Sequence, residues 1–90
     1  MRSKTTRRFR VLLGQLPDRV QRQAEQAYEL FRENPRHPGL QFKRVNSGEP
    51  AVYSARVGAQ YRALGVDRGD YILWFWIGTH NDDERLLRQV

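Results

Sequence analysis

Apolar positions in the first third of the chain recur at the spacing of a helix. One face of the predicted first helix carries Phe9, Leu12, Leu13 and Leu16. Either Thr5 or Thr6 can cap the start of this helix, which extends to about Gln15. Pro17 ends it and suits the first turn of a second helix.

The second helix, predicted from Asp18 to Glu33, has the clearest pattern. Its apolar stripe consists of Val20, Ala24, Ala27 and Phe31. Asn34-Pro35 ends the helix, because a residue before proline is displaced from helical backbone angles. Two helices joined by so short a turn form an antiparallel hairpin.

After residue 39 the pattern changes from helical to alternating. Predicted strands occupy residues 40–45, 51–57, 61–66 and 71–77. Their short connections, Gly58–Gln60 and Asp67–Asp70, are typical of turns between antiparallel strands. The last strand has no polar position, so we expect it inside the sheet with both faces at least partly covered. A short terminal helix is predicted from Asp82 to Val90.

The order of these elements predicts an α+β fold. We expect an N-terminal helical hairpin packed on one face of a four-stranded antiparallel sheet, followed by a short C-terminal helix. A chain of 90 residues has room for one domain, which we expect to span residues 1–90.

The charge of the chain restricts the possible binding partners more than its length does. The formal net charge is +6, from 16 basic and 10 acidic residues, and 14 of the basic residues are arginine. Arginine presents a flat fork of donors that suits phosphate, so a polyanionic partner, either nucleic acid or an acidic protein, is favoured. A basic surface that serves only solubility is the simpler alternative.

The residue inventory excludes several classes of site. The chain has no cysteine, which rules out disulfides, thiolate metal sites and cysteine nucleophiles. Its two histidines, His37 and His80, are not at a metal-ligand spacing, and no glycine-rich phosphate loop occurs, so we expect neither metal nor cofactor. No apolar run is long enough for a signal peptide or a membrane span, and we expect a cytoplasmic protein without a membrane partner.

Basic residues on the predicted strands suggest a chemistry. Arg56 lies on the second strand, Arg62 opens the third and His80 follows the fourth. Neighbouring strands lie about 4.8 Å apart, so such residues can form one cationic cluster. In RNA cleavage by the 2′-hydroxyl, Arg56 or Arg62 could stabilise the phosphorane and His80 could transfer a proton. Alternatively, the arginines pair with Asp67, Asp70 or the terminal carboxylates, and His80 only caps the last helix.

Several segments in order resemble the RelE/ParE superfamily of toxins from type II toxin–antitoxin systems. The most specific are Tyr53-Ser54-Ala55-Arg56-Val57, Tyr61-Arg62-Ala63-Leu64-Gly65 and Trp76-Ile77-Gly78-Thr79-His80. The resemblance covers nearly the whole chain. It implies the helical hairpin on a sheet and a cognate antitoxin, typically acidic in its toxin-binding segment, that masks the basic face. We expect the free toxin to be a monomer.

The RelE branch of that superfamily implies a ribosome-dependent mRNA endonuclease that blocks translation. Carried onto this chain, Arg56, Arg62 and His80 are the catalytic positions, and Lys43 and Arg44 support them by binding RNA phosphates. One departure is that no tyrosine follows His80, where the sequence reads Asn81-Asp82-Asp83-Glu84. A ParE-like inhibitor of DNA gyrase, or a degenerate nucleic-acid-binding homologue that does not cleave, are the alternatives.

Overall fold

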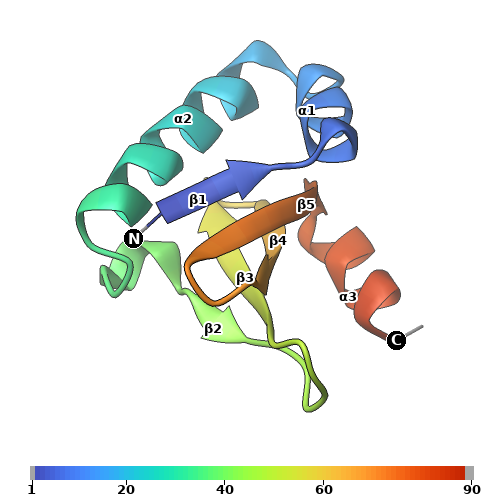
Figure 1. Cartoon of the computed structure of the whole chain (residues 1–90). Helices are drawn as coiled ribbons and strands as arrows, with labels where there is room; N and C mark the ends of the chain where they lie inside the picture. The colour runs from blue at the N-terminus through green and yellow to red at the C-terminus, as the bar shows by residue number, and fades with distance from the viewer. Residues whose placement is uncertain (1, 89–90) are drawn as a thin grey trace.

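The computed structural model describes residues 2–88 and arranges three helices around one mixed β-sheet (Figure 1). The elements are, in chain order, β1 (Arg2–Thr5), α1 (Arg7–Gly14), α2 (Asp18–Glu33), a 3-10 turn η1 (Pro38–Leu40), β2 (Lys43–Arg44), β3 (Val52–Val57), β4 (Tyr61–Asp67), β5 (Tyr71–Thr79) and α3 (His80–Arg88). The α+β class predicted from the sequence is confirmed.

The sheet has five strands in the order β1-β5-β4-β3-β2, one more than predicted. Strands β2 to β5 form the expected antiparallel meander. The additional strand, β1, pairs in parallel with β5, from Arg2 opposite Tyr71 to Thr5 opposite Trp74. Because Arg2–Thr5 contains no apolar residue, its sequence carries no strand pattern, and backbone pairing with β5 determines its place.

The helical hairpin covers one face of this sheet (Figure 1). Thr6 begins α1, since its Oγ1 accepts the backbone N–H of Phe9 at 3.0 Å. Helix α2 has the predicted bounds and buries Val20 and Phe31. The core that the hairpin forms with β3, β4 and β5 contains Phe9, Val20, Phe31, Ala55, Val57, Ala63, Trp74 and Ile77.

The first strand of the meander is much shorter than the predicted 40–45. Residues Pro38–Leu40 form η1, which His37 caps by accepting the backbone N–H of Gly39 at its Nδ1, 3.0 Å away. Gln41 then takes a left-handed backbone conformation with φ of 45°, so pairing with β3 begins only at Lys43. Leu40 nevertheless enters the core, where it is 1 % exposed.

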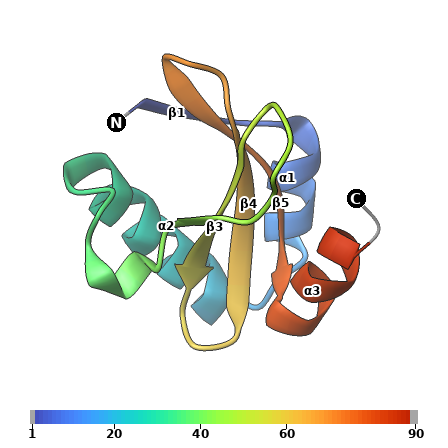
Figure 2. The same ribbon diagram turned by 90° about the horizontal axis from the view of Figure 1, so that it is seen from below.

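Strand β5 occupies the interior position expected for it, between β1 and β4. Figure 2 shows it beside β4. Its last residue, Thr79, leads directly into α3, which begins at His80 and not at Asp82 as predicted. Helix α3 packs against β5 and β4. The predicted helix end at residues 89–90 lies outside the described residues. No helix within residues 2–88 is long and apolar enough to cross a membrane.

Candidate functional site

Arg56 and Arg62 face each other across two neighbouring strands. They are direct cross-strand partners in the antiparallel pairing of β3 with β4. Side chains alternate along a strand, and Ala55, Val57 and Ala63 point into the core under the hairpin. Both arginines therefore lie on the opposite face of the sheet, which we call the arginine face.

Arg62 is buried in this face and held by neutral acceptors. It is 9 % exposed. Its Nη2 donates to Oε1 of Gln41 at 2.6 Å, and its Nη1 donates to Oγ of Ser54 at 3.4 Å. Burial of a cation is costly unless its donors are bonded, and these two contacts fix the guanidinium without neutralising its charge.

Arg56 is half-buried, and the turn after β3 fixes it. Its Nε donates to the backbone oxygen of Gly58 at 2.8 Å. Gly58 has φ of 63°, a left-handed conformation that favours glycine, and this geometry allows the chain to turn back into β4. The turn that reverses the strand thus also orients one of the two guanidinium groups.

His80 completes a pocket with the two arginines. It is exposed at the start of α3, and its backbone N–H donates to the backbone oxygen of Gln60 at 2.9 Å, which ties α3 to the β3–β4 turn. The pocket has a volume of about 250 Å³ and is lined by Gln41, Arg56, Ala59, Gln60, Tyr61, Arg62 and His80. The structure therefore brings the three predicted catalytic residues together, while their chemical roles stay predictions.

The surroundings do not favour the ion-pair alternative for the arginines. Among the side chains that the structure describes, neither Arg56 nor Arg62 forms an ion pair. Asp67 is engaged elsewhere, since its Oδ1 accepts the backbone N–H of Gly69 at 2.7 Å in the β4–β5 turn. The capping alternative for His80 is not needed either, because Oγ1 of Thr79 accepts the backbone N–H of Asp82 at 3.2 Å.

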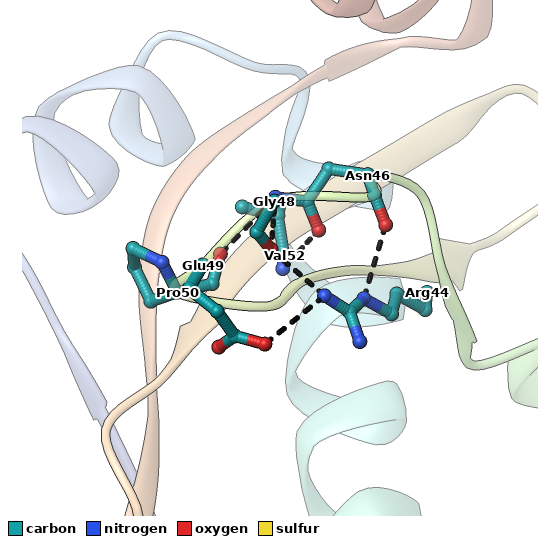
Figure 3. Close-up of polar contacts among 6 residues, drawn as sticks. All are labelled: Arg44, Asn46, Gly48, Glu49, Pro50 and Val52. Atoms are coloured by element: carbon teal, nitrogen blue, oxygen red, sulfur yellow. Dashed lines mark hydrogen bonds and ion pairs between the residues drawn. The ribbon is translucent and has the colours of Figure 1, made fainter.

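The two predicted phosphate-binding residues on β2, Lys43 and Arg44, lie on opposite faces of the sheet. Lys43 pairs with Ser54 and so shares its side of the sheet with Arg62, although it does not line the pocket. Arg44, the next residue, lies on the other side and folds over the turn that follows β2 (Figure 3). It donates to the backbone oxygens of Asn46 and Gly48 at 3.0 and 2.7 Å and approaches Glu49 at 3.5 Å. The structure thus does not bring Arg44 to the arginine face.

Sequence reasoning missed two polar side chains of the pocket, Gln41 and Gln60. Gln41 lies in a segment that the sequence suggested was regular strand, where it would have had no special role. Val45 breaks the alternation at the end of the predicted strand, but that signal lies four residues after Gln41 and does not point to it.

A larger cavity, of about 340 Å³, lies between the hairpin and the sheet and is lined mainly by apolar side chains such as Phe9, Leu13, Ala27 and Trp74. It offers space but few groups for chemistry. Within the described part of the chain, no group of three His, Asp or Glu residues is placed to hold a metal ion. The arginine face is therefore the candidate functional site.

Comparison with solved structures identifies proteins of the same shape. A RelE–RelB complex from Pyrococcus horikoshii OT3 contains a chain 17% identical to this one, with a TM-score of 0.70, covering 87% of this chain and 92% of that one. A RelB–RelE antitoxin–toxin complex from Methanococcus jannaschii is also 17% identical, with a TM-score of 0.71 and coverage of 91% and 95%. YafQ from E. coli strain BL21(DE3) is 13% identical, with a TM-score of 0.71 and coverage of 91% and 97%.

Identities this low establish a shared fold and nothing more specific. No curated protein sequence matches the chain significantly. A family profile described as "ParE-like toxin domain" matches residues 18–83, which are 66 of the 90 residues. That segment contains α2, the four meander strands and His80, and so includes the arginine face. On this match, together with the fold, the chain belongs to the ParE-like toxin domain family within the RelE/ParE superfamily of toxins.

Proposed function

We propose that this toxin is a ribosome-dependent mRNA endonuclease that blocks translation. The observation that carries the proposal is the pocket in which Arg56, Arg62 and His80 meet. Arg56 and Arg62 form no ion pair with any described carboxylate, so they can bind an anion. The imidazole of His80 beside them can transfer protons to or from groups next to that anion. The phosphodiester backbone of RNA fits both properties.

The chemistry needs charge stabilisation and proton transfer from these residues. The 2′-hydroxyl of one nucleotide attacks the adjacent phosphorus, the bond to the 5′-oxygen of the next nucleotide breaks, and a 2′,3′-cyclic phosphate results. Negative charge builds on the phosphorane oxygens, where the guanidinium groups of Arg56 and Arg62 can donate hydrogen bonds. The attacking 2′-hydroxyl loses a proton and the leaving 5′-oxygen gains one; His80 makes one of these two transfers, as an imidazole can near neutral pH, and solvent water makes the other.

Burial gives Arg62 the stronger electrostatic part in this scheme. A charge in a partly desolvated environment interacts more strongly with a developing anion than an exposed charge does. Arg62 is 9 % exposed and fixed by two acceptors, so it has little reorganisation to undergo when the phosphorane forms. Arg56 and His80, nearer to solvent, are placed for contacts that form as the RNA enters.

The residues after His80 motivate a second candidate function. Asn81-Asp82-Asp83-Glu84 carries acids and no tyrosine, and the matched family profile is ParE-like. An inhibitor of DNA gyrase on the same fold is therefore the alternative.

We also propose a cognate antitoxin as the protein partner. Two of the similar solved structures are complexes of RelE with RelB. The net charge of +6 favours an acidic binding segment that covers the arginine face. Because its substrate would be mRNA on the ribosome, the toxin would act in the cytoplasm, and we expect it to be a monomer when free.

In vitro translation followed by mapping of mRNA ends tests the endonuclease. Addition of the protein should stop translation and produce new mRNA ends within codons, only when ribosomes are present. A parallel supercoiling assay with purified DNA gyrase tests the alternative. Intact mRNA together with trapped gyrase–DNA complexes would reject the endonuclease in favour of the gyrase inhibitor, and inactivity in both assays would indicate a homologue that does not cleave.

A further inference from the structure

Gln41 has a backbone conformation that its residue type disfavours. Its φ of 45° makes it the one non-glycine residue with positive φ in residues 2–88. In this left-handed region the Cβ atom crowds the following carbonyl oxygen, and glycine or asparagine is the usual occupant. Such conformations persist where neighbouring structure enforces them, and they concentrate at functional sites.

Two anchors hold Gln41 in this conformation. The 3-10 turn before it is capped by His37 and buries Leu40 at 1 % exposure. The strand after it pairs through Lys43 with Ser54. Between these fixed points the left-handed residue redirects the chain, and the side chain of Gln41 extends to Arg62, which is 21 residues away in sequence.

The contact that results is a short hydrogen bond between two side chains. Nη2 of Arg62 lies 2.6 Å from Oε1 of Gln41, while its Nη1 lies 3.4 Å from Oγ of Ser54. Acceptors on two different nitrogens restrict rotation of the guanidinium plane as well as its position. A carboxylate in place of Gln41 would also orient the group, but it would compete with a phosphate for the same charge.

From this arrangement we propose that Gln41 is a positioning residue, which aligns the Arg62 guanidinium with the scissile phosphate of the RNA. The inference rests on the proposed endonuclease function and adds a residue to that site. A neutral amide suits the task, because it fixes the cation and leaves its full charge for the phosphorane. Gln41 acts through Arg62 and need not contact the reacting atoms itself.

The kinetic test compares three substitutions at one position. Gln41→Ala and Gln41→Gly should each lower kcat for mRNA cleavage by about 10- to 100-fold, which corresponds to the loss of one hydrogen bond to a charged group. KM should change little, since Arg56 and the remaining RNA contacts are kept. Gln41→Glu keeps an acceptor but adds a negative charge, so we expect mainly a higher KM. Gln26→Ala, on the exposed side of α2, is the matched control and should behave as wild type.

Thermal stability separates positioning from a merely structural role. Glycine relieves the unfavourable conformation at φ of 45°, so Gln41→Gly should melt at a higher temperature than Gln41→Ala. If Gln41 only supported the fold, activity would follow stability and Gln41→Gly would be the more active of the two. Low kcat in both variants, despite their different melting temperatures, supports the proposal. Wild-type kcat in Gln41→Gly would overturn it.

A spectroscopic measurement decides the point independently of cleavage. In ¹⁵N NMR, hindered rotation about the Cζ–Nη bonds gives resolved Nη signals for Arg62, which the variant Arg62→Lys identifies by their loss. These signals should broaden or merge in Gln41→Ala and stay resolved in Gln26→Ala. Unchanged Arg62 signals in Gln41→Ala would overturn the positioning role. If wild-type protein cleaves no mRNA, the proposed function fails, whereas this comparison still reports whether Gln41 holds Arg62.

Discussion

Arg56 on β3 and Arg62 on β4 are direct cross-strand partners, two like charges side by side on one sheet. Like charges directly opposite each other destabilise a pair of strands. No described carboxylate compensates either of them by an ion pair. The sheet thus tolerates a local repulsion that an anion bound between the two guanidinium groups would convert into an attraction.

A short, non-cleavable RNA oligonucleotide should therefore stabilise the folded protein. A ligand at about 100 times its Kd adds about 2.7 kcal/mol to the free energy of unfolding, and the melting temperature should rise accordingly. Differential scanning fluorimetry at low salt measures the shift. The variants Arg56→Gln and Arg62→Gln should lose most of it, while Arg22→Gln on the exposed side of α2 should keep it. An equal loss in all three would show general attraction to basic surface and contradict a local site.

Replacement of His80 should affect activity far more than stability. His80→Gln removes the proton carrier, and loss of general acid–base catalysis typically costs 10²–10⁴-fold, so we expect roughly that loss in mRNA cleavage. Because His80 is exposed, the free energy of unfolding measured in urea should change by no more than about 0.5 kcal/mol. Asn81→Ala, also exposed and adjacent in α3, is the control for local disturbance of the helix start. Full toxicity in His80→Gln would reject the proposed proton transfer.

Two glycine substitutions should change stability in opposite directions. A Cβ on Gly65 would lie 2.5 Å from Ile72 and 2.8 Å from the Trp74 ring, so Gly65→Ala overpacks the core and should cost about 1–3 kcal/mol. A Cβ added to Gly14, in the last turn of α1, would meet no atom within 4 Å, and Gly14→Ala should stabilise by about 0.4–1 kcal/mol. Urea denaturation of both variants measures the two signs. A stable Gly65→Ala protein would show that the β4–β5 contact is looser than described.

The choice between Thr5 and Thr6 as helix cap, which the sequence left open, can be checked by substitution. Oγ1 of Thr6 accepts the backbone N–H of Phe9, so Thr6→Ala should lower the free energy of unfolding by about 1 kcal/mol. Oγ1 of Thr5 accepts from the exposed side chain of Arg10, and Thr5→Ala should cost less than about 0.5 kcal/mol. Equal losses in urea denaturation would contradict the assignment of Thr6.

Periodicity predicted the long helix well because its signal is local. Val20 and Phe31 are buried by a stripe that the sequence shows directly, and α2 has the predicted bounds. β1 could not be predicted in this way. Arg2–Thr5 is polar, and it becomes a strand only because β5, almost seventy residues later, offers it a backbone edge.

The sequence predicted the main residues of the site but not the residue that holds Arg62 in place. Arg56, Arg62 and His80 were found from strand order, since adjacent antiparallel strands bring their residues together. Lys43 and Arg44 are consecutive on a strand, and alternation alone implies that they point to opposite sides, as the structure shows. The contact of Gln41 with Arg62 depends on a single left-handed residue, for which glutamine carries no sequence signal.

The parallel pairing of β1 with β5 has a consequence for the order in which the protein folds. β1 precedes every other strand of the sheet in the chain, and its partner, Tyr71–Thr79, follows all of them. Contacts so distant in sequence close slowly and cannot form on a partial chain. His80 directly follows β5, so the imidazole reaches its position when β5 completes the sheet. Arg56, Arg62 and His80 can therefore share one pocket only after β5 has joined the sheet.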